Sequence, residues 1–138
     1  MNSTQLYWQE LHGGLLPMPY ETCLMDDCYQ GYLVWAARNG EKMPARKNIF
    51  SAHFTAMNGV KRTSPLRIMD PDIPAAQQTM RSHLQQRIVY LMGEACPEGA
   101  DFNGFLNDKV SAWRVALKDY RNRGRSSGRY EGDENEPF

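Results

Sequence analysis

The chain is poor in cysteine and carries no net charge. Its 138 residues include three cysteines, an odd number without a CxxC pair, which excludes a disulfide framework as the source of stability. Cys23 and Cys28 lack further ligands at metal-binding spacing, so we expect buried free thiols rather than a zinc site. Basic and acidic residues number 16 each, so the chain as a whole has no electrostatic attraction to nucleic acid.

Long hydrophobic runs and catalytic motifs are also missing. No segment approaches the roughly 20 apolar residues that span a membrane, and residues 1–5 lack the basic and apolar regions of a secretory leader. We therefore expect a cytoplasmic protein without a membrane partner. The sequence contains no nucleophile beside a base, no glycine-rich phosphate loop and no HExxH motif, so we expect neither catalysis nor a cofactor.

The first half of the chain has the pattern of a helix-turn-helix followed by a wing. Apolar side chains at three- and four-residue intervals predict helices over residues 4–12, 22–39 and 45–58. Gly40 ends the second helix, and a short connection that contains proline leads into the third. Residues 60–69 predict one or two short strands around Ser64-Pro65, because proline cannot donate to a ladder and suits a tip or an edge.

The helix predicted over residues 45–58 has two different faces. Its inner stripe consists of Ile49, Phe50, Phe54 and Met57. Its exposed face begins with side chains of the types that contact phosphates and base edges. With the basic side chains of the wing they form the candidate DNA-binding set, which is Arg46, Lys47, Asn48, Ser51, Thr55, Lys61, Arg62 and Arg67. An ordinary solvated helix face is the alternative interpretation of these residues.

Aromatic residues are concentrated in the helix predicted over residues 22–39. Tyr29, Tyr32 and Trp35 could form a stacking platform for bases, but their helical spacing favours packing in the core. Gly31 lies within the same helix, where glycine lowers stability, so it indicates close approach of a neighbouring element.

The second half of the chain predicts two long helices and a tail. Met80, Leu84, Ile88 and Leu91 predict a helix from about residue 75 to 96, and Asp101 caps a second helix that extends to about residue 122. We expect these helices to pair as an antiparallel hairpin over residues 71–123, followed by a disordered tail over residues 124–138. The expected core includes Tyr32, Trp35, Phe50, Phe54, Leu84, Ile88, Trp113 and Leu117.

Residues 5–70 resemble the C-terminal winged-helix module of phage and plasmid primase-helicases of the poxvirus type. The resemblance rests on Leu6-Tyr7-Trp8, Leu11, Gly14, Tyr29, Tyr32, Trp35, Asn39-Gly40-Glu41-Lys42, Pro44, Arg46, Phe50 and Phe54. It implies a domain that contacts DNA behind a helicase motor. The chain contains no such motor, so the resemblance is compatible with a fragment of a larger primase-helicase and with a small phage-type protein that uses the module alone.

These observations predict a mostly α chain with a winged-helix-like domain over residues 1–70. The expected function is a non-catalytic DNA-binding or replication-associated module of a phage or mobile element, with DNA as the partner. The alternative class is a small phage-type adaptor or inhibitor that binds a host or replication protein. The neutral net charge and the acidic end of the chain favour this alternative.

Overall fold

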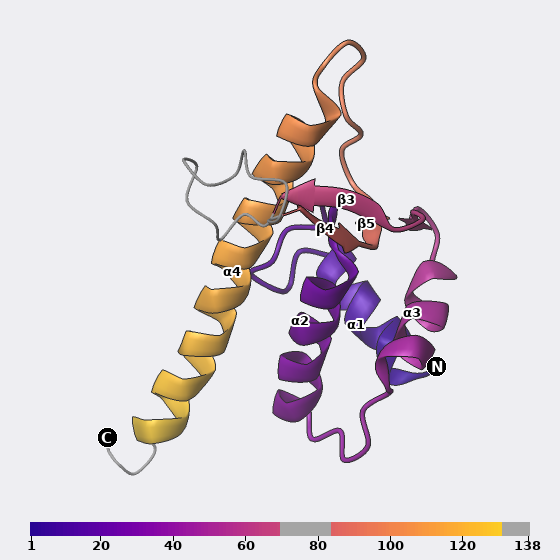
Figure 1. Cartoon of the computed structure of the whole chain (residues 1–138). Helices are drawn as coiled ribbons and strands as arrows, with labels where there is room; N and C mark the ends of the chain where they lie inside the picture. Colours follow the sequence, from indigo (N-terminus) through magenta and orange to yellow (C-terminus); the bar gives the residue numbers. More distant parts are fainter. Residues whose placement is uncertain (70–83, 131–138) are drawn as a thin grey trace.

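Helices form most of the regular structure of the chain. The computed structural model describes residues 1–69 and 84–130, and within them the mostly α expectation is confirmed (Figure 1). The helices are α1 (Ser3–His12), α2 (Met25–Arg38), α3 (Lys47–Thr55) and α4 (Phe102–Tyr130). The strands are β1 (Cys23–Leu24), β2 (Lys61–Arg62), β3 (Leu66–Met69), β4 (Leu84–Arg87) and β5 (Val89–Leu91). In Figure 1, α4 runs along one side of the molecule, and α1, α2 and α3 pack together beside it.

The helix α1 begins with a reciprocal cap at Asn2. The Asn2 side chain accepts a hydrogen bond from the backbone nitrogen of Gln5 at 2.8 Å, and the Gln5 side chain accepts one from the Asn2 nitrogen at 3.0 Å. This capping box satisfies two backbone donors that a helix start leaves unpaired. Tyr7 and Leu11 then lie on the buried side of the helix, as its apolar spacing predicts.

A glycine allows three elements to meet at α2. A Cβ atom on Gly31 would lie 2.7 Å from Tyr7 Oη of α1 and 3.1 Å from the Trp113 ring of α4. Both distances are shorter than ordinary carbon contacts, so any side chain at this position would displace its neighbours. The close approach expected from the sequence is therefore confirmed.

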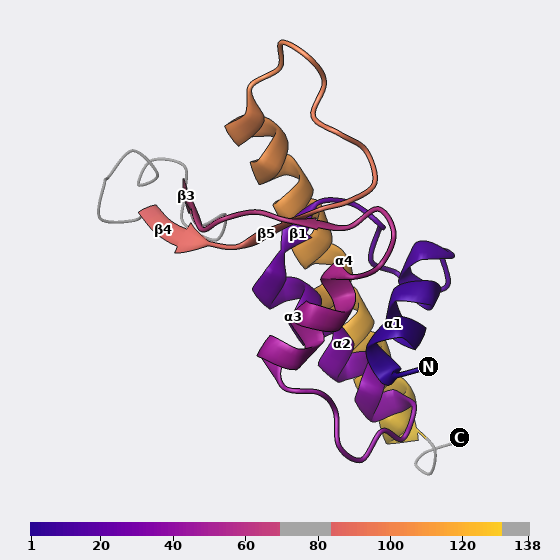
Figure 2. The same cartoon turned by 90° about the vertical axis from the view of Figure 1, so that its right-hand side faces the viewer.

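Two small antiparallel sheets pack against the helices. In one sheet β5 lies between β1 and β2, and in the other β3 pairs with β4. Between the pairs Arg62–Tyr90 and Leu66–Arg87, three residues on one strand face two on the other, which is a β-bulge at Ser64-Pro65. Figure 2 shows β3 and β4 extending from the helical body as a ribbon. Residues 60–69 hold two short strands, β2 and β3, in agreement with the prediction of one or two, but they pair with β5 and β4 and not with each other, so this segment alone does not form a wing.

The prediction of a helix over residues 75–96 is wrong for the residues of this range that the structure describes. Residues 84–87 and 89–91 form β4 and β5, so the expected helical hairpin over residues 71–123 does not form, and residues 75–83 lie outside the described part. A short apolar run such as Ile88 to Met92 fits both a helix and a buried strand, and only pairing with β1 and β2 decides between them. The same pairing converts Cys23 and Leu24, expected at the start of a helix, into β1.

The helix α4 begins where the sequence predicts and ends later. Asp101 accepts hydrogen bonds from the backbone nitrogens of Asn103 and Gly104 at 3.3 and 3.1 Å, which confirms the cap. The helix continues to Tyr130, so the prediction of a disordered tail is wrong for residues 124–130. The rest of the predicted tail, residues 131–138, lies outside the described part.

The core has two parts, one on each face of the sheet formed by β1, β5 and β2. The larger part is aromatic and lies among the helices, and its bulkiest members are Tyr7, Tyr32, Trp35, Phe50, Phe54, Tyr90 and Trp113. The smaller part is aliphatic and consists of Leu24, Ile68, Val89, Leu106 and Val110. Six of the predicted core residues are buried, Ile88 is half-buried, and the side chain of Leu84 is not described.

Candidate nucleic-acid interface

Two segments of the chain are rich in basic residues: residues 109–129 of the sequence hold seven lysine and arginine residues with one acidic residue, and residues 42–69 hold six. Residues 42–69, here called the basic segment, contain six lysine and arginine residues and no acidic residue, although the whole chain is neutral. The six residues are Lys42, Arg46, Lys47, Lys61, Arg62 and Arg67, and all are exposed. The segment includes α3, β2 and β3, so positive charge is held on a defined part of the fold.

The helix α3 is placed by hydrogen bonds at its entrance. Tyr29 Oη donates to the backbone oxygen of Ala45 at 2.9 Å, and the Ala45 nitrogen donates to Tyr32 Oη at 2.8 Å. Lys47 Nζ lies 2.6 Å from Asp26 Oδ1, which joins the first turn of α3 to the first turn of α2. The tyrosines therefore fix the connection between the helices and pack in the core, as their spacing predicts.

One side of α3 remains open to solvent. We define the α3 surface as the set Asn48, Ile49, Ala52, Thr55 and Ala56, of which all are exposed except the half-buried Thr55. Ile49, expected on the inner stripe, is 46% exposed, so that prediction is wrong. The reason is that Phe50, Ser51 and Phe54 fix the inner side of the helix, which turns Ile49 outward.

Ser51 belongs to the core and not to the exposed face. It is 2% exposed, and its hydroxyl accepts a hydrogen bond from Tyr90 Oη at 2.8 Å. Burial raises the pKa of Tyr90, and this effect exceeds the opposing effects of the Ser51 hydrogen bond and of the Arg62 charge. The prediction that Ser51 contacts DNA is wrong, because a buried hydroxyl with a buried partner cannot reach a base.

The two faces of the sheet carry different basic residues. Tyr90 points towards α3, where its ring stacks on Phe54 with the centroids 5.3 Å apart. Arg62 pairs directly with Tyr90, and paired residues of antiparallel strands share a face, so Arg62 lies on the α3 side. Lys61 pairs with Leu91 and lies on the opposite face, because successive side chains alternate along a strand.

Arg67 lies on the face of the β3–β4 sheet opposite Ile68. Its neighbour Ile68 is buried with Val89 and Leu106 on the side of the sheet that α4 covers. Alternation along β3 therefore directs Arg67 to the other side, where it is exposed. The structure thus places Arg62 on the α3 side of its sheet, directs Arg67 to the face of the β3–β4 sheet opposite Ile68, and separates Lys61 from Arg62.

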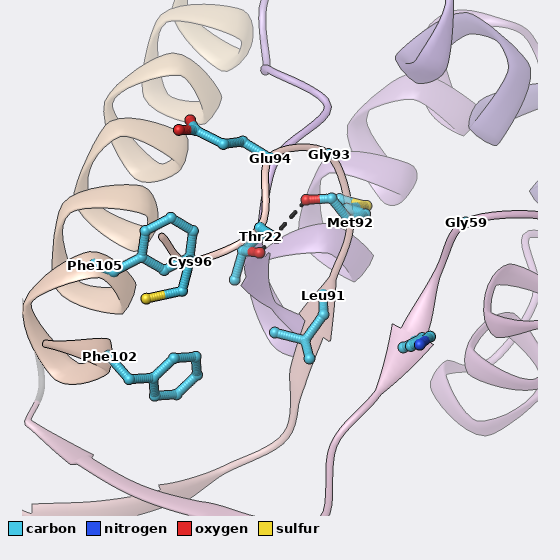
Figure 3. A pocket seen from close by; sticks show the side chains of 11 residues that line it. Thr22, Gly59, Leu91, Met92, Gly93, Glu94, Cys96, Phe102 and Phe105 are labelled. Carbon is cyan, nitrogen blue, oxygen red and sulfur yellow. Dashed lines mark hydrogen bonds between the residues drawn. The ribbon is translucent and has the colours of Figure 1, made fainter. Parts of the chain in front are cut away.

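A pocket occupies the opposite side of the sheet. It has a volume of about 360 Å³ and lies between β5 and the start of α4. Figure 3 shows the rings of Phe102 and Phe105 on one side of it and Leu91 on the other. The Thr22 hydroxyl donates to the Met92 backbone oxygen at 3.5 Å beside it. Lys61 contributes to its lining, which further distances this lysine from the α3 surface.

Two of the three cysteines lie in the core. Cys23 and Cys28 are buried free thiols, as expected, and burial raises the pKa of Cys23. A thiol held in its protonated form is a poor nucleophile and a poor metal ligand. Among residues 1–69 and 84–130, no three His, Cys, Asp or Glu side chains gather as metal ligands would.

Comparison with known proteins found no matching family model, curated protein or solved structure. Of the helices in the described part of the chain, none has both the length and the apolar character needed to cross a membrane.

The sequence-based prediction omits one exposed apolar residue and one basic residue. Ile49 belongs to the α3 surface although its spacing suggested the inner stripe, and Lys42 belongs to the basic segment but is not among the candidates. A helical wheel centred between Phe50 and Phe54 turns Ile49 away from the core. The absence of acidic residues from the basic segment would have pointed to Lys42.

Proposed function

We propose that this chain is a winged-helix protein that binds duplex DNA through the α3 surface and the arginines beside it. The basic segment is the observation that carries the proposal, because it holds six basic residues and no acidic residue in a neutral chain. DNA presents one negative charge per roughly 1.7 Å of axis, so a patch of one sign suits its backbone.

The order of the elements supports the winged-helix part of the proposal. A winged helix has a helix-turn-helix pair followed by a β-hairpin that forms the wing. Here α2 and α3 are the helix pair, β5 lies between β1 and β2, and β3 with β4 is the candidate wing. In Figure 2, the start of α3 and the ribbon of β3 and β4 lie on the same side of the molecule.

The contacts at the entrance of α3 support binding by a rigid helix. The hydrogen bonds of Tyr29 and Tyr32 to Ala45 hold the connection, and Phe50 and Phe54 hold the helix against the core. A helix fixed in this way enters the major groove without a further ordering cost. In the proposed complex, Arg46, Arg62 and Arg67 contact phosphates on either side of the groove.

We extend the proposal to replication on the strength of the resemblance of residues 5–70 to a primase-helicase module. In this role the chain is a DNA-contacting part of a phage or mobile-element replication system. The alternative, an adaptor or inhibitor that binds a host protein, makes a different prediction, because such a protein needs no affinity for duplex DNA.

A salt titration tests the proposal. We expect the protein to shift a duplex of about 20 base pairs at ~50 mM salt, and its affinity to fall steeply as the salt rises to ~200 mM. The logarithm of the affinity should fall with a slope of about 0.9 per phosphate contact. No binding to duplex DNA at ~50 mM salt would refute the proposal and leave the adaptor as the better interpretation.

A further inference from the structure

The α3 surface has a composition that suits one kind of base pair. Its members are one amide, one hydroxyl and three apolar side chains, without a charged residue. The basic residues Arg46 and Lys47 lie at the start of the helix, and Lys47 is engaged by Asp26. Beyond its first turn α3 carries no lysine or arginine, and its one histidine, His53, is half-buried.

Base pairs differ in what they require from a protein in the major groove. Guanine presents two acceptors that arginine or lysine pairs with, and cytosine presents a donor that a carboxylate accepts. Adenine pairs with the amide of asparagine or glutamine, and thymine presents a methyl group that packs against apolar side chains. The α3 surface has the partners of adenine and thymine and lacks those of guanine and cytosine.

We propose that the α3 surface distinguishes A·T from G·C base pairs in the major groove. In this arrangement Asn48 pairs with the edge of adenine, and Ile49 and Ala52 pack against thymine methyl groups. The inference rests on the proposed function, since it describes what the same surface recognises. Charge complementarity favours a nucleic acid as the occupant, because the exposed Arg46 begins the helix and Arg62 lies on the α3 side of the sheet, whereas Lys61 faces the other way and Lys47 is paired with Asp26.

The exposure of Ile49 makes a methyl contact possible. Its side chain is 46% exposed because Phe50 and Phe54, which are fully buried, fix the opposite side of the helix. Ala52 is short enough to let the helix approach a base closely, and Ile49 extends beyond it by a branched side chain. Ile49 and Ala52 together thus offer a small apolar surface against which a thymine methyl group can pack.

Modified bases test the inference with the unaltered protein. We compare three duplexes of equal length at ~50 mM salt: one rich in A·T, the same duplex with uracil in place of thymine, and one rich in G·C. Uracil differs from thymine only in lacking the methyl group. We expect the A·T duplex to bind roughly tenfold more tightly than the G·C duplex, and the uracil duplex to lose part of that preference.

Two substitutions locate the effect. Ile49→Ala should abolish the difference between the thymine and uracil duplexes, and Asn48→Ala should remove most of the preference for A·T that the uracil duplex retains. Leu15→Ala is the matched control for Ile49→Ala, because Leu15 is 75% exposed and lies within residues 1–41, which contain one basic residue. A difference between thymine and uracil that survives Ile49→Ala would come from DNA shape and would contradict the methyl contact.

The outcomes separate the inference from the proposed function. Failure to bind any of the three duplexes at ~50 mM salt refutes DNA binding itself. Equal affinity for the A·T and G·C duplexes, with no loss on replacing thymine by uracil, refutes the inference and leaves duplex binding intact. Circular dichroism of both α3 variants confirms that a loss of preference does not come from unfolding.

Discussion

At the scale of single residues, the aromatic core determines which side chains of α3 are available for binding. Phe54 is fully buried and stacks on Phe50 at 5.3 Å and on Tyr90 at 5.3 Å. Ser51 completes this inner side with its hydrogen bond to Tyr90. The alternation of core and solvent along α3 therefore follows from these contacts, and Ile49 is exposed because Phe50 occupies the core.

Truncation of the large core residues should be costly. Phe54→Ala and Trp113→Ala should each lower the free energy of unfolding by about 3–5 kcal/mol, because each leaves a large cavity among packed rings. Phe102→Ala is the control, since Phe102 is 38% exposed and should lose much less. Urea denaturation measures all three, and a loss below about 1 kcal/mol for either core variant would contradict the packing described.

Removal of the Ser51 hydroxyl should affect stability and not sequence preference. Ser51→Ala leaves the buried Tyr90 hydroxyl without its partner and should cost about 1–3 kcal/mol. The double variant Ser51→Ala with Tyr90→Phe removes both polar groups and should recover much of this loss. A change of base preference in Ser51→Ala, with stability unchanged, would show that the hydroxyl reaches DNA after all.

Alkaline pH should weaken the fold. Burial raises the pKa of Tyr7 and of Tyr90, so the folded protein retains two protons that the unfolded chain releases near pH 10. The stability from these neutral tyrosines is fully present below about pH 10 and is lost as the pH rises above it. Urea denaturation at pH 8 and pH 11 should show the fall, and Tyr90→Phe should show a smaller one. Equal stability of the wild type at both values would contradict it.

At the scale of elements, the sequence predicts local structure well and long-range pairing poorly. The helices over 4–12, 45–58 and the start of α4 follow from spacing and caps that lie within a few residues of one another. The strands β4 and β5 do not, because Leu84, Ile88 and Leu91 also fit a helical period. Their pairing with β1 and with β2 and β3 joins segments far apart in the chain, and no local pattern records it.

The candidate site was predictable in part for the same reason. Arg46, Asn48 and Thr55 were located from the helical period, and each is exposed or half-buried on α3. The register of β2 against β5 determines on which face of the sheet Lys61 and Arg62 lie, and the sequence alone does not give this register. The register of that pairing decides which of two adjacent basic residues lies beside α3.

The junction of α1, α2 and α4 should reject a side chain at Gly31. Alanine normally stabilises a helix relative to glycine by up to about 1 kcal/mol. At Gly31 the added methyl group would meet Tyr7 and Trp113, so Gly31→Ala should instead lower the free energy of unfolding by about 1–3 kcal/mol. Thermal denaturation measures the sign, and a rise in melting temperature would show that the helices do not approach as described.

At the scale of the whole molecule, charge is separated although the total is zero. Residues 1–41 contain five acidic residues and one basic residue, whereas the basic segment contains six basic residues and no acidic one. The basic segment therefore attracts a polyanion although the total charge is zero, and residues 109–129 of α4, with seven basic residues and one acidic residue, form a second positive region.

The acidic end of the chain should oppose DNA binding. Residues 131–138 contain four acidic residues and no basic residue, so deleting them leaves a chain of net charge +4. We expect the shortened chain to bind duplex DNA more tightly at ~50 mM salt, with a smaller difference at high salt where charges are screened. Fluorescence anisotropy measures both, and weaker binding by the shortened chain would show that the acidic residues assist the interaction.

The most direct test of the account compares two adjacent basic residues on opposite faces of one sheet. Arg62→Ala and Lys61→Ala each remove one positive charge from β2, but only Arg62 lies on the α3 side. We expect Arg62→Ala to weaken duplex binding and to lower the salt slope by about one unit, and Lys61→Ala to leave both unchanged. Equal losses in the two variants would contradict a defined interface at α3 and indicate attraction to charge alone.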